Sequence, residues 1–203
     1  MDNNTRSKRT RAAVIQAALT IIARDGAGHL TLDAIARESG ISKGGLMHQF
    51  RTKKAVLAAL MEHQATFFEN YARSHIAAHG HQHVQPRLAA EIATLHAAVA
   101  DPHSLALALL GAVAQEPELL GTTRMADREA LEVIRAEAAD PDLATLRWLA
   151  ARGLTLSSLF GLSPLTDAER DHLFALLSDE ARWTGKPGDG KPGNGKDVGA
   201  EKG

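Results

Sequence analysis

Residues 31–54 read TLDAIARESGISKGGLMHQFRTKK, and this stretch decides the fold of the first quarter of the chain. Thr31 is a favourable helix N-cap, and the apolar residues after it recur at the spacing of one helix face. Gly40 ends that helix, because glycine readily takes the left-handed conformation in which a chain leaves a helix. Ser42 caps a second helix, whose inward face includes Leu46. Two short helices joined by a tight turn are typical of a helix-turn-helix, in which the second helix enters the major groove of DNA.

The stretch also fits a longer pattern, T-x-x-x-I-A-x-x-x-G-I-S-K-G-x-L-x-x-x-F-x-(S/T)-K. The residues that fill it are Thr31, Ile35, Ala36, Gly40, Ile41, Ser42, Lys43, Gly44, Leu46, Phe50, Thr52 and Lys53. In this pattern the chain resembles the DNA-binding domain of the TetR family of transcriptional regulators. Members of that family usually carry an aromatic residue after the leucine, threonine or serine before it, and histidine before the phenylalanine, where this chain has Met47, Gly45 and Gln49. These departures concern one hydroxyl contact to a phosphate and not the fold.

The second helix of this motif offers both backbone and side-chain groups to DNA. Its N-terminus carries unpaired N–H groups and a partial positive charge, which suit a phosphate. Gly44 and Gly45 remove side-chain bulk there, and Lys43 is best placed to reach the O6 and N7 atoms of a guanine. Because few side chains remain for direct readout, we expect DNA shape and phosphate register to supply much of the specificity. The predicted DNA-binding residues are Arg9, Thr31, Ser42, Lys43, Gly44, Gly45, His48, Gln49 and Lys53.

The chain has 203 residues and a net charge of −1, which conceals an uneven distribution of charge. Residues 1–54 hold ten Lys and Arg against four Asp and Glu, a net of +6, and the remainder holds 13 against 20, a net of −7. A basic module on an acidic body is expected of a protein that lays one end on a phosphate backbone. The alternative is surface charge that is uneven without a function.

Composition also limits the classes of protein to which the chain can belong. The sequence has no cysteine, which excludes a disulfide framework and a thiolate zinc site. The polar start MDNNTRSKRTR leads into no apolar signal core, so we expect a cytoplasmic protein. The longest apolar run, residues 105–114, is about half of the ~20 residues that span a bilayer, which predicts no membrane segment.

Helical signals continue along the rest of the chain, and no alternating strand pattern appears. We therefore expect an all-α fold of about nine helices. Residues 1–52 are predicted to form a three-helix helix-turn-helix DNA-binding domain, with a flexible basic arm at residues 1–11. Residues 53–183 are predicted to form a helical effector-binding and dimerisation domain that begins with a long helix capped by Thr52. The Gly/Lys/Pro tail at residues 184–203 lacks the apolar residues needed to offset its ordering entropy and is expected to be disordered.

The last two predicted helices, at residues 143–160 and 168–183, carry wide apolar faces. The resemblance to the TetR family implies that this pair packs against the same pair of a second copy as a four-helix bundle, which is an isologous interface. The alternative is that both faces close the core of one chain. The residues predicted for the dimer interface are Leu146, Leu149, Leu156, Phe160, Leu173, Phe174 and Leu177.

The same resemblance implies a pocket in the body, between the middle helices and the long helix, where a small molecule alters the spacing of the two DNA-binding heads. We expect an apolar or amphipathic effector, because the candidate residues combine aromatic side chains with a few polar groups. For any single one of them the alternative is plain core packing. The predicted pocket residues are Phe67, Phe68, Tyr71, Leu95, His96, Leu109, Gln115, Met125 and Trp148.

Four histidines at positions 75, 79, 81 and 83 raise the question of a metal site. His75 and His79 are spaced to share a helix face, but no carboxylate or cysteine lies inside the cluster, and a solvated polar loop explains it equally well. We therefore predict no metal and no cofactor. The chain has no phosphate-binding glycine loop, no G-x-S-x-G and no H-E-x-x-H motif, which argues against an enzyme.

Together these signals predict a homodimeric regulator, most simply a repressor, that binds a palindromic double-stranded DNA operator and releases it on binding a small molecule. Two alternatives remain at this point. The chain is either a DNA-binding regulator without a small-molecule effector, or a helical adaptor that has lost DNA binding, which the departures at Gly45 and Met47 leave open.

Overall fold

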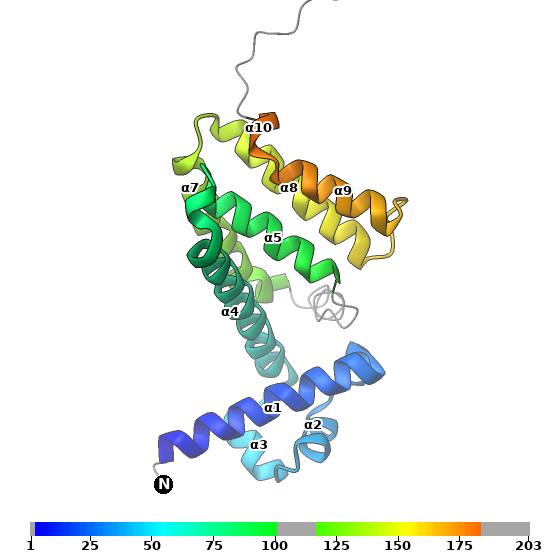
Figure 1. The fold of residues 1–203 in the computed structure, drawn as a ribbon. Coiled ribbons are helices and arrows are strands. Elements are labelled where there is room, and N and C mark those ends of the chain that lie inside the picture. Colours follow the sequence, from blue (N-terminus) through cyan, green and yellow to red (C-terminus); the bar gives the residue numbers. More distant parts are fainter. Residues whose placement is uncertain (1–2, 101–116, 184–203) are drawn as a thin grey trace, which may run out of the picture.

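The computed structural model describes residues 3–100 and 117–183, and Figure 1 shows a small head and a larger body joined by one long helix. The head contains α1 (Asn3–Asp25), α2 (Leu32–Ser39) and α3 (Lys43–Gln49), and the long helix is α4 (Lys53–His79). The body contains α5 (Pro86–Ala100), α7 (Gly121–Glu137), α8 (Pro141–Leu159), α9 (Asp167–Ser178) and α10 (Glu180–Trp183). Three short 3-10 helices lie at Ala27–His29, Gly80–Gln82 and Pro117–Leu120.

The described ranges contain these nine α-helices and no strand, which confirms the predicted all-α fold with a helix-turn-helix at its N-terminal end. None of the helices in the same ranges combines the length and the apolar character that crossing a lipid bilayer requires. The predicted disordered tail at 184–203 and the predicted pocket residues Leu109 and Gln115 lie outside the described residues.

Local hydrogen bonds fix where the helices of the head begin and end. Thr31 Oγ1 accepts a hydrogen bond from the Ala34 backbone N–H at 3.1 Å, and Ser42 Oγ accepts one from the Gly45 N–H at 3.2 Å. Gly40 follows α2 with a φ of 67°, in the left-handed region that favours glycine. The caps satisfy N–H groups that have no partner inside their own helices, so α2 and α3 start where the sequence predicts.

One apolar core holds the three head helices together and extends into α4. Its large buried members are Leu119 of the 3-10 helix before α7, together with Val14, Ile21, Ile22, Leu30, Ile35, Leu46, Phe50, Val56, Leu57 and Leu60. The last three of these belong to the first two turns of α4. The long helix therefore begins inside the core of the head rather than beside it.

The first helix is longer than the sequence predicts. It begins at Asn3, so residues 3–11 are helical and the prediction of a flexible arm is wrong for them. These polar residues form no apolar stripe. They can still be helical, because each residue added to a helix that has already formed gains one backbone hydrogen bond. Side chains also hold this end in place: Gln49 Nε2 donates to Ser7 Oγ at 2.9 Å. Arg11 Nη2 pairs with Glu62 Oε2 of α4 at 2.9 Å.

A second apolar core closes the body. Its buried members are Leu88, Ile92, Ile134, Ala144, Trp148, Ala151, Phe174 and Leu177, from α5, α7, α8 and α9. Phe174 is only 1% exposed and stacks on the His96 ring with 4.6 Å between ring centroids. The prediction that Phe174 and Leu177 form the dimer interface is therefore wrong, because both side chains are used inside one chain. The alternative reading of that face, closure of the monomer core, holds for these two residues.

Arg147 is a buried cation inside the body, at 3% exposure. Its Nε and Nη2 donate to the Leu177 carbonyl oxygen at 3.1 and 2.6 Å, and its Nη1 donates to Gln85 Oε1 at 2.8 Å. These bonds fasten α8 to the end of α9 and to the start of α5. They use the carbonyl at the C-terminal end of a helix, where the helix dipole favours a cation.

The histidine cluster lies at the turn between α4 and α5. The His75 ring is 5.0 Å from that of His79 and 6.1 Å from that of His83, measured between centroids, and the second pair is stacked. Within the described ranges, no three or more His, Asp or Glu side chains are arranged to hold a metal ion. His75 Nδ1 is buried without a hydrogen-bond partner. Burial, followed by the proximity of His79 and His83, lowers the pKa of His75 below its ordinary value of 6.5.

Acidification is expected to destabilise the fold through His75. Between the lowered pKa and 6.5 the unfolded chain binds more protons at this residue than the folded chain. The stabilising contribution is therefore complete above pH 6.5 and is lost as the pH falls through the folded pKa. Substituting His75→Gln should weaken the dependence of Tm on pH between about pH 7.5 and about pH 5.5. Equal pH dependence in the wild-type and His75→Gln proteins would contradict this assignment.

Candidate functional site

The exposed end of α3 carries the groups that sequence reasoning assigns to DNA. Lys43, Gly44 and His48 are exposed, while Leu46 between them is buried in the head core. The first turn of α3 is thus anchored from one side and open on the other. A helix N-terminus with this exposure presents backbone N–H groups, which attract a phosphate oxygen.

The two glycines of this helix play different roles. A Cβ atom at Gly44 would meet nothing within 4 Å, so this position is open to an approaching duplex. A Cβ atom at Gly45 would lie 3.2 Å from Ile41 Cγ2 and 3.3 Å from Ser42 Oγ. Gly45 therefore faces the turn between the helices, and its missing side chain favours close packing of that turn more than the approach of DNA.

Lys43 is paired across the motif with an acid of α2. Its Nζ lies 2.8 Å from Asp33 Oδ1 of α2, and both side chains are about two-thirds exposed. The hydrogen bond from Lys43 holds the pKa of the Asp33 carboxyl below its ordinary value. Sequence reasoning missed Asp33, which was visible only as an acid in the first turn of α2. An exposed pair of this kind contributes little to stability, so Lys43 can exchange Asp33 for a base edge at low cost.

The remaining predicted DNA-binding residues all belong to the head or its junction with α4. Arg9, Lys53 and His48 have exposed side chains, on α1, on the first turn of α4 and on α3 respectively. Gln49 is half-buried and engaged with Ser7. The Thr31 and Ser42 oxygens accept capping hydrogen bonds, and their hydroxyl hydrogens remain available to donate to a phosphate.

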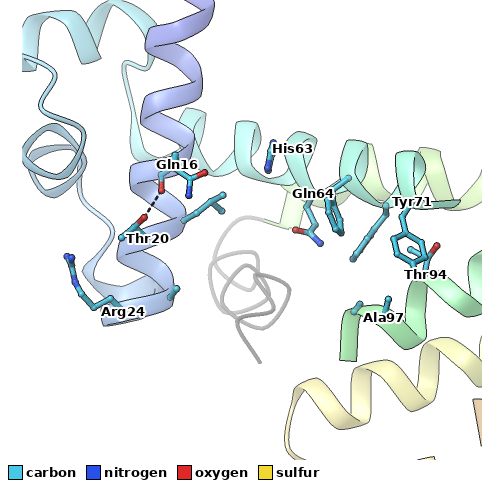
Figure 2. Close-up of a pocket in the computed structure, with 13 residues that line it drawn as sticks. Gln16, Thr20, Arg24, His63, Gln64, Tyr71, Thr94 and Ala97 are labelled. Carbon is cyan, nitrogen blue, oxygen red and sulfur yellow. Dashed lines mark hydrogen bonds between the residues drawn. The ribbon is translucent and has the colours of Figure 1, made fainter. Parts of the chain in front are cut away.

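A hollow of about 600 Å³ lies between α1, α4 and α5 (Figure 2). Three predicted pocket residues, Phe67, Phe68 and Tyr71, line it from α4. The other lining residues are Gln16, Leu19, Thr20, Ala23 and Arg24 from α1, His63 and Gln64 from α4, and Thr94, Ala97 and Ala98 from α5. The α1 residues are not among the predicted pocket residues, because the resemblance to the TetR family implies a pocket between the middle helices and the long helix.

The other described pocket candidates lie elsewhere, so the structure does not gather the predicted set into one cavity. Trp148 and Leu95 pack in or against the body core. His96 stacks on Phe174 and bonds to Asp171 of α9 at 3.0 Å through its Nε2. Met125 is 66% exposed on α7. For Trp148 the alternative applies, because this residue is packed in the core.

The predicted dimer residues divide into two groups. Phe174 and Leu177 are buried, as described above, and Leu173 is half-buried. The others, Leu146, Leu149, Leu156 and Phe160, are between 40% and 62% exposed. These four are spaced by three, seven and four residues along α8 and its C-cap, which places them on one helix face. An apolar stripe of this length on an exposed helix is typical of a protein–protein interface.

Comparison with known proteins agrees with this division into head and body. The family model described as "Bacterial regulatory proteins, tetR family" matches residues 14–60. The model described as "Tetracyclin repressor-like, C-terminal domain" matches residues 69–182, more than half of the chain. The uncharacterized HTH-type transcriptional regulator TtgW of Pseudomonas putida is 38% identical over 55 residues, which cover 27% of this chain and only 41% of that relative.

Solved structures share the fold at low sequence identity. A TetR transcription regulator from Haloarcula marismortui matches with a TM-score of 0.69 and 18% identity over 87% of this chain and 98% of its own. A TetR-family regulator from Rhodococcus sp. matches with a TM-score of 0.62 and 21% identity, covering 83% and 97% of the two chains. The multidrug binding protein EbrR, complexed with ethidium, matches with a TM-score of 0.58 and 21% identity over the same shares of the two chains. Since one family model accounts for the head and another for the body, this chain belongs to the TetR family of transcriptional regulators.

Proposed function

We propose that the chain is a homodimeric repressor that binds a palindromic DNA operator through two heads and leaves it when a small molecule binds the body. The observation that carries the proposal is the exposed N-terminal turn of α3, with Lys43 and an open Gly44, on a head whose sequence is strongly basic. A chain of this kind acts on DNA rather than as an enzyme, and its place of action is the cytoplasm.

The long helix supplies the connection that regulation requires. Val56, Leu57 and Leu60 of α4 are buried in the head core, whereas Ala72 is buried further along the same helix, which also packs against α5 of the body. Glu69 Oε2 of α4 also pairs with Arg87 Nη2 of α5 at 3.0 Å. A shift of the body against α4 therefore moves the head, and in a dimer it changes the spacing of two heads. An effector acts on DNA binding only if it favours one of the two arrangements.

An aromatic effector is compatible with this fold. EbrR is a multidrug binding protein solved with ethidium, and its chain shares the head-and-body arrangement. For the present chain we propose an apolar or amphipathic small molecule, because aromatic side chains of α4 remain open to solvent beside a hollow. A regulator without an effector would bind DNA but would not respond to any such compound.

The dimer is proposed to form through the exposed stripe of α8. Leu149 is 51% exposed at the centre of this stripe, so a glutamate there would place two like charges across an isologous interface. Leu149→Glu is expected to raise the dimer dissociation constant by about tenfold or more, as read by sedimentation velocity over a dilution series. The matched control is Met125→Glu, which adds the same charge to an exposed apolar position of α7 outside the stripe. If both variants dissociate alike, or neither does, the α8 stripe is not the interface.

The function as a whole is tested by selecting duplexes from a random DNA pool with the purified full chain. Recovery of an inverted repeat, bound with an affinity that falls steeply as salt rises, is the expected result. Failure to retain any duplex at low salt would contradict the proposal and leave the helical adaptor. Retention of duplexes without an inverted repeat would contradict binding by two symmetric heads.

A further inference from the structure

The hollow of Figure 2 separates the head from the body on one side of the molecule. In the described residues, the buried α4 members of the core that this helix shares with α1 lie at the start of α4, among them Val56, Leu57 and Leu60. Further along α4, Phe67 is 57% exposed and Tyr71 is 39% exposed, and both line the hollow. One wall therefore belongs to the DNA-binding head, through α1, and the other walls belong to α4 and the body helix α5.

The walls of the hollow suit a flat aromatic molecule. Phe67 and Phe68 form a tilted pair with 6.1 Å between ring centroids, and Tyr71 lies one turn further along the same helix. Leu19 on α1 and Ala97 on α5 supply apolar surface on the other walls. Offset or edge-to-face contact with such rings is favourable for an aromatic ligand. The volume, about 600 Å³, lies in the range of sites that take drug-sized molecules.

Polar side chains that could form hydrogen bonds with a ligand line the same hollow. The side chains of Gln16, His63, Gln64 and Tyr71 line the hollow and donate or accept no hydrogen bond to another residue in the described ranges. Figure 2 shows that these groups come from both sides, with Gln16 on α1 and the others on α4. A ligand with one or two polar atoms can therefore be held by the head and by α4 at the same time.

The described lining residues offer little charge to pair with an ionic ligand. No Asp or Glu appears among the lining residues in the described part of the chain. The one Lys or Arg among them is Arg24, whose Nη2 is 3.0 Å from both Asp25 Oδ2 and Glu38 Oε2. Figure 2 shows Arg24 at the rim, extending away from α4 and α5. An anionic ligand would find no unpaired Lys or Arg among these residues, so its charge would be poorly compensated against the apolar wall.

We propose that this hollow is the effector site, that it takes a neutral aromatic molecule with one or two hydrogen-bonding groups, and that the ligand acts by contacting α1 directly. The inference rests on the proposed function and specifies its ligand. A molecule bound between α1 and the middle of α4 holds these helices apart at the open end of the hollow. Among the described residues, the core that α1 and α4 share and the Arg11–Glu62 pair both lie in the N-terminal part of α4, so we expect the separation to turn the head relative to the body.

The chain has no cysteine, which allows a tethered ligand to be placed in the hollow of the full-length protein. In a Thr20→Cys variant, benzyl methanethiosulfonate attaches a neutral aromatic ring by a disulfide that dithiothreitol removes. The matched control is Thr66→Cys on α4. The hydroxyls of both threonines donate to the carbonyl four residues earlier, at 3.0 Å for Thr20 and 2.8 Å for Thr66, but only Thr20 lines the hollow.

The expected result is that benzylation of the Thr20→Cys variant weakens binding to the selected operator by about tenfold or more, and that dithiothreitol restores it. Benzylation of the Thr66→Cys variant should leave the affinity unchanged. Unchanged affinity in the modified Thr20→Cys variant would overturn the inference, as would equal weakening in both variants. The unmodified variants must bind the operator, and if they do not while the wild-type protein does, Leu19→Cys replaces Thr20→Cys. Failure of the wild-type protein to bind any duplex would instead overturn the proposed function.

The charge preference is tested with free ligands on the wild-type protein. Isothermal titration with 2-naphthol, 2-naphthoate and ethidium presents a neutral, an anionic and a cationic aromatic molecule. We expect 2-naphthol to bind more tightly than 2-naphthoate by about tenfold or more, and Phe67→Ala to weaken it. Tighter binding of either ion, or no binding of 2-naphthol at millimolar concentration, would overturn the proposed ligand class.

Discussion

Replacing Phe174 with alanine is expected to lower the free energy of unfolding by about 3–5 kcal/mol. The side chain is 1% exposed and joins α9 to α5 and α8 in the body core. Its removal gives up the transfer free energy of a buried aromatic ring and leaves a cavity between the three helices, which close-packed neighbours fill only in part. The stacked contact with His96 is lost as well.

Urea denaturation at a fixed protomer concentration measures this loss, since the stability of a dimer depends on concentration. The control is Phe67→Ala, which removes the same ring from a position that is 57% exposed. We expect it to change the free energy of unfolding by less than about 1 kcal/mol. Equal losses for the two substitutions would mean that Phe174 does not belong to the core of one chain.

Replacing Lys43 with alanine is expected to weaken operator binding by about 2–6 kcal/mol per dimer, because each of two heads loses a base contact of about 1–3 kcal/mol. Lys43 is exposed at the first turn of α3, and its only ion pair among the described residues, with Asp33, is at the surface. The preference for one base pair in each half-site should also relax.

The affinities of the variants are measured over a series of point-mutated operators, and Lys53→Ala is compared with Lys43→Ala. A residue that contacts phosphate should weaken binding to all duplexes about equally and reduce the salt dependence by about one counterion per head. Arg128→Ala, an exposed change on α7, should alter neither affinity nor preference. If Lys43→Ala binds every duplex as the wild-type protein does, α3 is not the recognition helix.

The local features of the fold followed from the sequence because they depend on a few neighbouring residues. Thr31, Ser42 and Thr52 cap their helices through bonds to a backbone N–H three residues later, and Thr166 with Glu169 forms a capping box at the start of α9. Each of these bonds lies within one turn of chain, so a short motif determines it.

The errors concern contacts between helices that are distant in sequence. The apolar faces of α8 and α9 were recognised from the sequence. The width of an apolar face does not show which of its residues are covered within one chain, as Phe174 is, and which stay exposed, as Leu149 does. The predicted pocket residues include the α4 wall of the hollow but not its α1 wall. The angle at which α1 approaches α4 cannot be read from the spacing of apolar residues in either helix. The pair of Lys43 with Asp33 likewise depends on how α2 and α3 cross.

The burial of Val56, Leu57 and Leu60 in the head core has a consequence for modularity. A fragment that stops at residue 52 would carry all three head helices and yet expose the apolar surfaces that these α4 side chains cover. A chimaera that joins this head to the body of another regulator would need to keep its own sequence through Leu60 and supply an apolar residue in place of Leu119, which is buried in the same core. The part of this chain that could be transferred to another protein as a DNA-binding unit therefore extends beyond the helix-turn-helix and includes the first two turns of α4.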